Sequence, residues 1–340
     1  MKNLLSICLF TLLAVVLAAC SSNDASSTTK EQASNEQLSI YTTVYPLQYF
    51  TERIGGDYVD VKSIYPTGAN EHSFEPTQKD MMALADSDLF FYIGLGLEGF
   101  VEKAKKTLAH EDVKLVATAD NVTEEQLHIS TGHTHAEAIG EDDHEHEGHD
   151  HAEEAVEVEP NEHAHTDHDA HVWLSPVISQ DLALVIKEEL VAAMPEQAEL
   201  FTSNYEALVA DLQVLHDDFE AMATATTSKT FFVSHAAFGF IAGHYGFTQV
   251  PVAGLNSQSE PSQKELTAIV DLAKKENIDY IFFEQNVSSN LASVIQKEVG
   301  ADTLILHNLS VLTQDDIDND ENYFSLMRKN IDALQKALTR

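Results

Sequence analysis

The stretch LSIYTTVYPLQYFTERI, residues 38–54, places an apolar run directly before a segment with helical periodicity. Leu38–Val44 is rich in β-branched and aromatic residues, which predicts a strand. Pro46–Ile54 predicts a helix, since proline is tolerated in a first helical turn. A strand followed at once by a helix is the unit from which parallel sheets are built.

The same alternation continues towards the C-terminus. Further strands in the first half are predicted at Tyr58–Ile64, Asp88–Ile93 and Val113–Val116, with helices at Gln78–Ala85 and Glu98–Leu108. After Lys229 the predicted strands are Thr230–Val233, Thr248–Val252, Tyr280–Phe283 and Thr303–Leu306. The helices there are predicted near Phe238–His244, Ser262–Glu276, Ser288–Val299 and Glu321–Leu338. The chain therefore predicts an α/β fold with two domains, each a mainly parallel sheet flanked by helices.

A long helical pattern, Pro195–Ala223, lies between the two halves. Its apolar positions recur at helical spacing: Leu200, Leu208, Leu212, Leu215 and Phe219. At about 1.5 Å per residue such a helix would span roughly 40 Å. It is expected to be a rigid backbone helix that joins the domains, the alternative being a core helix of one domain. The predicted boundaries are 38–178 for the N-terminal lobe, 179–228 for the linking helical segment and 229–340 for the C-terminal lobe.

The first 37 residues have the layout of a secretory signal followed by a polar tether. One Lys precedes a mostly apolar run too short for a typical membrane span, and small residues follow it. Leu17–Cys20 resembles the lipobox of bacterial lipoproteins, which predicts a signal peptide at 1–19, a lipidated Cys20 and a tether at 20–37. The alternative is a plain signal peptide with an incidental Cys. Cys8 would be discarded with the signal, so the mature body holds no thiol for disulfides or thiolate metal sites.

The composition is strongly acidic, with 19 Lys and Arg against 56 Asp and Glu and a formal net charge of −37. Nucleic acid is excluded as a partner, because binding a polyanion needs clustered basic residues. The apolar share of 44% excludes wholesale disorder. Eleven of the 17 His fall between His128 and His171, in and around a low-complexity acidic segment, residues 126–170. That segment cannot bury a core and is expected to be a loop.

Four residues outside the loop occupy positions suited to a ligand. His72, His235 and Glu284 each follow a predicted strand, and His171 closes the acidic segment. In α/β sheets, ligands bind beyond the carboxyl ends of strands, so an interdomain cleft is where these side chains could meet. Three imidazoles and a carboxylate form a tetrahedral set for Zn²⁺. An isolated His after a strand is more often a packing residue, but four such placements together favour a metal site.

These residues stand in motifs that carry a resemblance. The motifs are Glu71–Pro76 (EHSFEP), His171–Pro176 (HVWLSP), Val233–Gly239 (VSHAAFG) and Phe283-Glu284. From about Leu38 to the C-terminus, the chain resembles the zinc-specific, ZnuA-like metal-binding lipoproteins of ABC uptake systems, solute-binding protein family 9 (cluster A-I). The resemblance implies two α/β domains with metal in the cleft, held by His72, His171, His235 and Glu284. In some relatives an acid at the place of Glu71 contacts the metal, so Glu71 is an alternative fourth ligand.

The resemblance also implies a function and its partners. The chain is expected to be a monomer that captures extracytoplasmic Zn²⁺ as transported ligand and delivers it to an ABC permease with its ATPase subunit. It would be held on the bacterial membrane by its lipid anchor and would not be an enzyme. The alternatives are a manganese-binding member of the family, a zinc hydrolase or a surface adhesin. No H-E-x-x-H motif of a zinc hydrolase occurs.

The acidic loop adds a second, weaker prediction. Its alternating His and acidic residues suit weak, exchangeable cation binding, the alternative being a solvated acidic spacer. The auxiliary ligands would be His133, His135, His144, His146, His149, His151, His163, His165 and His168. The remaining His lack any such placement and are expected to be surface or packing residues: His110, His128, His216, His244 and His307.

Overall fold

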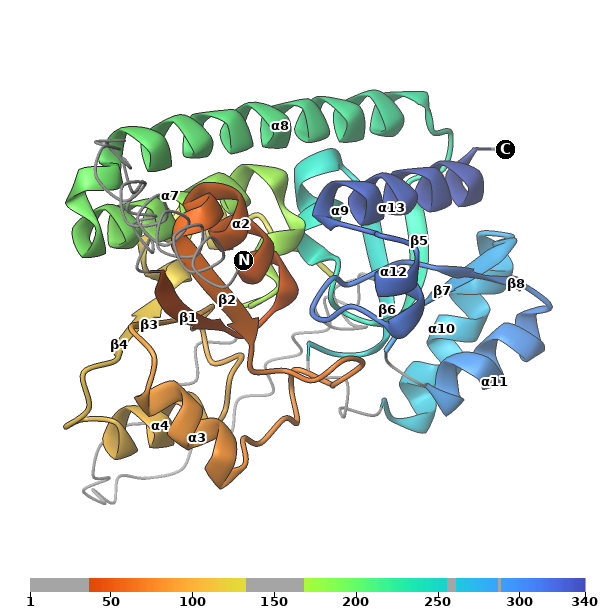
Figure 1. Ribbon diagram of the computed structural model, residues 1–340. Coiled ribbons are helices and arrows are strands. Elements are labelled where there is room, and N and C mark those ends of the chain that lie inside the picture. Colours follow the sequence, from red (N-terminus) through yellow and green to blue (C-terminus); the bar gives the residue numbers. More distant parts are fainter. Residues whose placement is uncertain (1–36, 133–167, 256–260, 287–288, 340) are drawn as a thin grey trace, which may run out of the picture. The chain divides into compact units, whose positions relative to one another are not determined.

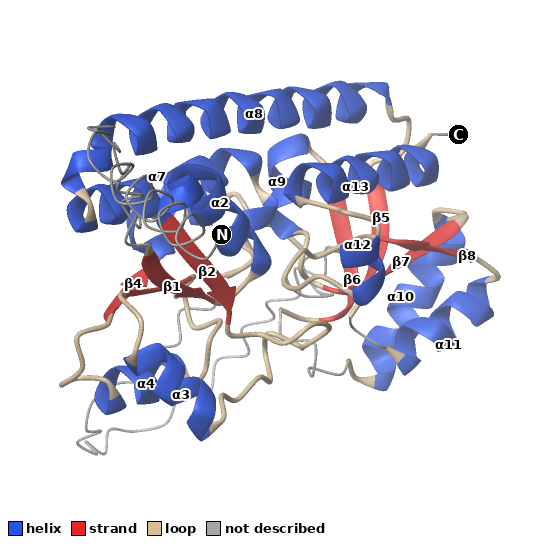
Figure 2. Ribbon diagram, viewed as in Figure 1, coloured by secondary structure: helices blue, strands red, loops and turns tan. Residues whose placement is uncertain are grey.

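The computed structural model describes residues 37–132, 168–255, 261–286 and 289–339. Its framework is a pair of four-stranded sheets in which every strand pair is parallel (Figures 1 and 2). The strand orders are β2-β1-β3-β4 and β6-β5-β7-β8, so the first and third strands of each half are central. The predicted fold class is confirmed, because both halves are parallel sheets flanked by helices.

The strands lie close to their predicted positions. In the first sheet they are β1 (Leu38–Thr42), β2 (Val59–Ser63), β3 (Leu89–Tyr92) and β4 (Lys114–Ala117). In the second they are β5 (Thr230–His235), β6 (Thr248–Ala253), β7 (Tyr280–Phe283) and β8 (Asp302–Ile305). The central strand β3 is buried along its whole length, which is why it appears in the sequence as a continuous apolar run.

Helices connect these strands. In the first half they are α2 (Tyr45–Gly55), α3 (Gln78–Ala85), α4 (Val101–Thr107) and the short α5 (Glu124–Leu127). In the second half they are α9 (Gly239–Tyr245), α10 (Gln263–Lys275), α11 (Asn290–Val299), α12 (Gln314–Asp318) and α13 (Tyr323–Leu338). Within the described residues, none of the helices has the length and apolar character needed to cross a bilayer.

Two helices, not one, lie between the halves. α7 (Pro176–Ala193) runs into the single-turn 3₁₀ helix η4 (Pro195–Gln197), which leads into the 28-residue α8 (Ala198–Ala225). The predicted long helix is confirmed: Pro195 opens it with the 3₁₀ turn, and the α-helix continues to Ala225, two residues beyond the predicted end at Ala223. Leu200 is 40% exposed and does not belong to the buried stripe. Phe201 is fully buried in its place, seven residues before Leu208.

The helix predicted at Glu98–Leu108 begins later, at Val101. The Glu98 carboxylate belongs to the preceding turn, where it accepts hydrogen bonds from the backbone N–H groups of Ile93 (2.8 Å) and Gly94 (3.1 Å). It also accepts one from the hydroxyl of Thr43 (2.8 Å). Burial raises the pKa of Glu98 in spite of these donors. The carboxylate therefore fixes the end of β3 against β1.

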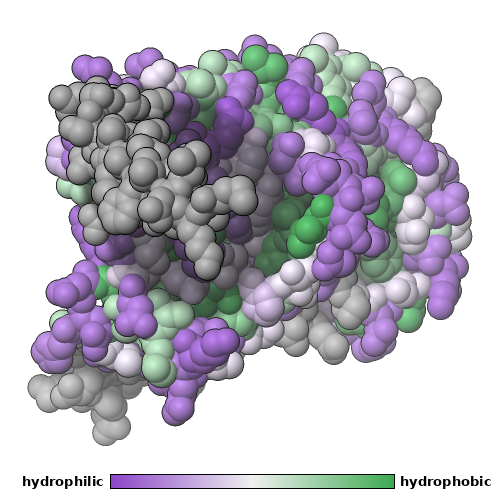
Figure 3. Space-filling model, viewed as in Figure 1, coloured by the Kyte–Doolittle hydropathy of each residue, from purple (hydrophilic) through white to green (hydrophobic). Residues whose placement is uncertain are grey.

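A continuous apolar core spans both halves of the chain. It includes residues of the first sheet, of α7 and α8, of one face of the second sheet and of α13. A smaller core of Phe232, Val250, Ile269, Ile281 and their neighbours packs between the other face of the second sheet and α10 and α11. On the face drawn in Figure 3, hydrophilic residues prevail along the outer edges and apolar ones show between them. The shared core fixes the carboxyl ends of the two sheets close to one another.

Candidate metal centre

His72 lies in a turn after β2, in the segment that leads to α3. The Asn70 carboxamide oxygen accepts a hydrogen bond from the His72 backbone N–H at 3.0 Å, a local contact that favours a turn here. The side chain of His72 is 10% exposed, and its Nε2 atom is buried without a hydrogen-bond partner. Burial, with His171 and His235 nearby, lowers the pKa of His72 to about 2. Its imidazole is therefore neutral and has a lone pair to offer.

His171 is held by a carboxylate two residues before it. Asp169 Oδ1 accepts hydrogen bonds from the backbone N–H of His171 (2.9 Å) and from its Nδ1–H (2.7 Å). Because Nδ1 donates, the lone pair of the ring is on Nε2, which is buried and has no hydrogen-bond partner. Burial opposes the charge of Asp169, but the bonds from His171 and Ser130 outweigh it and lower the pKa of that carboxyl. Such a carboxylate–imidazole pair fixes the tautomer and orientation of a metal-binding His.

His235 is the last residue of β5 and is fully buried. Its Nδ1 lies 2.9 Å from both carboxylate oxygens of Glu284, and its Nε2 lies 3.2 Å from the Leu255 carbonyl oxygen. Both neighbours are acceptors, so both ring nitrogens can donate only in the charged imidazolium. Burial disfavours that charge, but Glu284 outweighs burial and raises the pKa of His235. A metal must therefore displace a proton from this ring.

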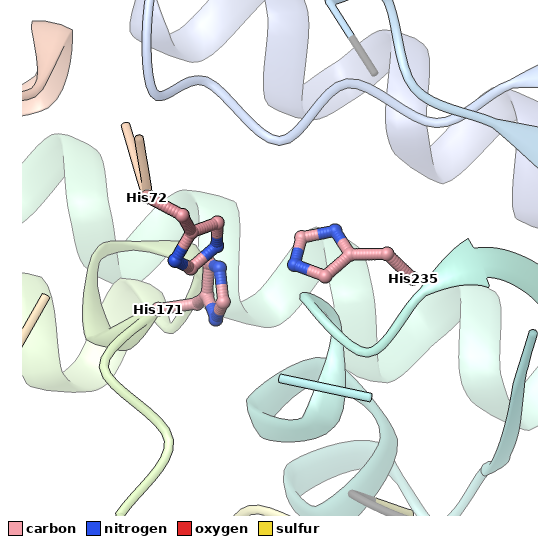
Figure 4. A group of neighbouring side chains, drawn as sticks. All are labelled: His72, His171 and His235. Atoms are coloured by element: carbon pink, nitrogen blue, oxygen red, sulfur yellow. The ribbon is translucent and has the colours of Figure 1, made fainter. Parts of the chain in front are cut away.

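The three imidazoles converge from three distant parts of the chain. Their ring centroids are 5.3 Å apart for His72 and His171, 5.3 Å for His72 and His235, and 5.1 Å for His171 and His235. Figure 4 shows the ring of His235 pointing towards the other two from the opposite side. The candidate ligand atoms all lie within 4.8 Å of one another, so one ion can reach all three.

The two candidate carboxylates flank this trio without joining it. Glu284, which follows β7, also accepts hydrogen bonds from the Ser234 hydroxyl (2.9 Å) and from Asn308 Nδ2 (2.8 Å). With His235 these donors outweigh burial and lower the pKa of Glu284. Glu71 is 2% exposed, and its Oε1 lies 3.9 Å from His72 Nε2. Glu284 is thus held against His235, and Glu71 lies beside His72.

Asn308 and Ser310 are site residues that the sequence prediction missed. Asn308 Nδ2 donates to Glu284 Oε2 (2.8 Å) and to Glu71 Oε1 (3.3 Å), and the Ser310 hydroxyl donates to Glu71 Oε2 (2.9 Å). Both residues follow β8, so the same carboxyl-end rule that selected His235 and Glu284 could have found them. Their hydrogen bonds tie an acid of the first half to the second half of the chain.

Besides the trio and the two acids, the sequence analysis named further His residues and Cys20. His307 is 5% exposed and contacts Asp316 (3.1 Å), so it is a packing residue. Cys20 and the auxiliary His133, His135, His144, His146, His149, His151, His163 and His165 lie outside the described residues. His168 is described, and its Nε2 lies 3.5 Å from Glu124 Oε2.

Two parallel-sheet domains linked through a long helix, with buried imidazoles where the sheet ends meet, define the class of two-domain solute-binding proteins. The family model described as "Zinc-uptake complex component A periplasmic" matches residues 40–337. The chain belongs to this family of ABC zinc-uptake components.

Individual relatives agree with that assignment. The zinc-binding protein AdcA of Streptococcus pyogenes is 34% identical over 310 residues, which is 90% of this chain and 57% of the relative. This chain thus spans little more than half the length of that protein. The high-affinity zinc uptake system protein ZnuA of Bacillus subtilis is 32% identical over 330 residues, 97% of both chains. Among solved structures, the Zn(II)-bound ZnuA-like domain of Streptococcus pneumoniae AdcA has a TM-score of 0.68 at 31% identity, covering 89% of this chain and all of that one.

Proposed function

We propose that this chain captures Zn²⁺ outside the cytoplasm with His72, His171 and His235 and delivers it to the permease and ATPase of an ABC importer. The observation that carries the proposal is the pair of buried Nε2 atoms of His72 and His171, which lack hydrogen-bond partners and lie beside a third buried imidazole. A buried polar atom without a partner costs roughly 1–3 kcal/mol, and a bound cation removes that cost.

The ligand set favours zinc. Imidazole nitrogens suit Zn²⁺, whereas oxygen-rich sets suit Mn²⁺, and affinity at a given N/O site rises from Mn²⁺ towards Zn²⁺. One carboxylate, Glu284 or Glu71, completes four-coordination, and the other stays hydrogen-bonded to Asn308. Closed four-ligand zinc sites leave no open position for a catalytic water, so the chain acts as a binding protein and not as a hydrolase.

The rest of the molecule fits a membrane-held receptor. In this proposal residues 1–19 are a signal peptide, Cys20 is lipidated and residues 20–37 are a tether. Lobes 38–178 and 229–340 form a monomeric receptor around the linking segment 179–228. The match to the zinc-uptake family and the names of the zinc-binding relatives support an ABC permease and its ATPase subunit as the partners.

A metal competition experiment tests the proposal. Purified protein is dialysed against equimolar Zn²⁺ and Mn²⁺ at neutral pH, and its metal content is measured. We expect one tightly held Zn²⁺, which His72→Ala, His171→Ala and His235→Ala each weaken by at least about 100-fold, since even indirect partners of a ligand cost 10–100-fold. His110→Ala is the control, because His110 is exposed and outside the trio. Wild-type protein that retains Mn²⁺ would contradict the proposal.

Glu284→Gln and Glu71→Gln then identify the fourth ligand. The variant that lacks the ligand loses more zinc affinity than the variant that lacks only a hydrogen-bond partner. Glu284→Ala is expected to cost less than the loss of any of the three His, since water or Glu71 can fill the vacated position. A Glu284→Ala variant that loses zinc as completely as the three His variants would contradict this ranking.

A further inference from the structure

A second group of metal-ligating side chains lies at the neck of the acidic loop, where the described chain enters and leaves it. It consists of Glu124, His128 and His168, whose candidate ligand atoms all lie within 4.8 Å of one another. His168 Nε2 is 3.5 Å from Glu124 Oε2, and the ring centroids of His128 and His168 are 6.2 Å apart. Ligands on a tetrahedral Zn²⁺ with bonds of about 2.1 Å are roughly 3.4 Å apart, so the measured imidazole–carboxylate separation already matches that of a bound pair.

Glu124 and His128, the two ligand candidates where the chain enters the loop, are held in place by α5. Glu124 and His128 are four residues apart, and the His128 N–H donates to the Glu124 carbonyl at 3.0 Å, so both side chains project from one face of the turn. Thr123 forms a capping box with Gln126, and Leu127 is buried in the core. The carboxamide of Gln126 also donates to Asp181 of α7 at 2.6 Å.

His168, the ligand candidate at the other end of the loop, is held in place by its neighbour Asp169. Asp169 Oδ2 accepts a hydrogen bond from the Ser130 hydroxyl at 2.5 Å, so the two ends of the loop are joined at this point. The first end is tied to the second half of the chain, where the Thr131 N–H donates to the Gly239 carbonyl at 3.2 Å. The neck is therefore built on fixed backbone, which gives a metal site the preorganisation that isolated loop ligands lack.

We propose that Glu124, His128 and His168 form a second site for a divalent transition metal, with Zn²⁺ as its occupant. Three protein ligands leave a position for water, and two of the three side chains are exposed. The ion is therefore exchangeable and bound more weakly than at the buried trio. Two imidazoles and one carboxylate favour Zn²⁺ over Ca²⁺ or Mg²⁺, which prefer oxygen ligands. The neck site and the trio share no ligand, although Asp169 contacts residues of both.

Residue-resolved protection from chemical modification tests the neck site in the full-length mature protein. Histidines are carbethoxylated with diethyl pyrocarbonate at increasing Zn²⁺ and each site is quantified by mass spectrometry. We expect His128 and His168 to become protected together, after the first equivalent of Zn²⁺ and before the histidines between 133 and 165. His110 is the control and should stay reactive throughout.

Single variants separate a joint site from independent weak binding. His168→Ala should abolish the protection of His128, and Glu124→Gln should raise the Zn²⁺ concentration for half-protection of His128 by about tenfold or more. His235→Ala should leave the neck protection unchanged, which keeps this test separate from that of the trio. Protection of His128 that persists in His168→Ala, or that appears only together with the whole loop, would overturn the proposal.

Discussion

Asp169 is the residue on which the trio and the loop neck both depend. One of its oxygens holds both the backbone and the ring of His171, and the other holds Ser130 across the neck. Asp169 is 1% exposed, and the hydrogen bonds that it accepts from its neighbours offset the cost of burying its charge. A single acid therefore sets the tautomer of a proposed zinc ligand and closes the loop at its base.

Asp169→Asn tests the orienting role. An amide at this position can still accept from the His171 backbone, but it no longer fixes Nδ1 as the protonated nitrogen. We expect zinc affinity at the trio to fall by about 10–100-fold while the trio itself still binds one zinc at saturation. Isothermal titration of wild type, Asp169→Asn and the exposed control Asp211→Asn measures this. Unchanged affinity in Asp169→Asn would show that the carboxylate is only structural.

The pKa values at the trio predict how many protons zinc displaces. His72 is neutral at any physiological pH, since its pKa is lowered to about 2, whereas the pKa of His235 is raised. A raised pKa means that the metal-free ring is charged below that value and must lose a proton to bind zinc. Affinity should therefore fall as pH decreases, beginning above the ordinary imidazole pKa of about 6.5.

Calorimetry in buffers of different ionisation enthalpy measures this release. At pH 6.5 we expect His235, whose pKa is raised above the ordinary value of about 6.5, to contribute more than half a proton per zinc and His72 to contribute none. Glu284→Gln removes the charge that raises the pKa of His235, so proton release at the same pH should decrease. Release that stays the same in Glu284→Gln would contradict the assignment to His235.

At the scale of elements, the strand ends and the 3₁₀ turn η3 (Val172–Leu174) before α7 position the site. His235 ends β5, Glu284 follows β7, and Asn308 follows β8, so three neighbouring strands of one sheet each supply a polar side chain at the same edge. His171 precedes η3, whose Trp173 is fully buried and donates from Nε1 to the Asn308 carbonyl at 2.7 Å. Buried aromatic packing thus fixes the segment that carries one ligand.

Excision of the loop is the prediction at this scale. Replacing residues 133–167 with a short Gly-Ser linker should leave one tight zinc site, because His72, His171, His235 and both acids remain. The cut should spare Gly132, whose φ of +71° and close approach to Gln249 leave no room for a side chain. Equilibrium titration against wild type should show the loss of several weaker equivalents. Loss of the tight site would mean that the loop supplies a principal ligand.

At the scale of the molecule, polar contacts join the two sheets at the trio. Asn286 of the second half donates to the Ala69 carbonyl at 3.0 Å, and the Tyr45 N–H donates to the Ser310 carbonyl at 2.9 Å. Together with the bonds that Glu71 receives, these contacts surround the imidazoles with groups from both halves. The net charge of −37 favours the approach of cations to such a molecule.

Membrane tethering is the prediction that concerns the whole chain. Cys20→Ala removes the proposed lipidation site, so the protein should be released from the membrane or remain unprocessed. Fractionation of cells with mass measurement of the N-terminus checks this, and Cys8→Ala serves as the control because it lies within the proposed signal. A Cys20→Ala protein that stays membrane-bound after normal processing would contradict the lipoprotein prediction.

The sequence by itself determined the βα order, the parallel sheets and the candidate positions of His72, His235 and Glu284 after strands, because these depend on local periodicity and on a rule that holds for every α/β sheet. Two points required the tertiary structure. The pairing of His128 with His168 depends on a contact between Ser130 and Asp169, 39 residues apart, that no local pattern reveals. The protonation of His235 depends on Glu284 and the Leu255 carbonyl, and Asn308 donates to both Glu71 and Glu284 only because the two sheets meet at their carboxyl ends. Burial and hydrogen bonding from distant elements, unlike residue type and spacing, are properties of the folded chain alone.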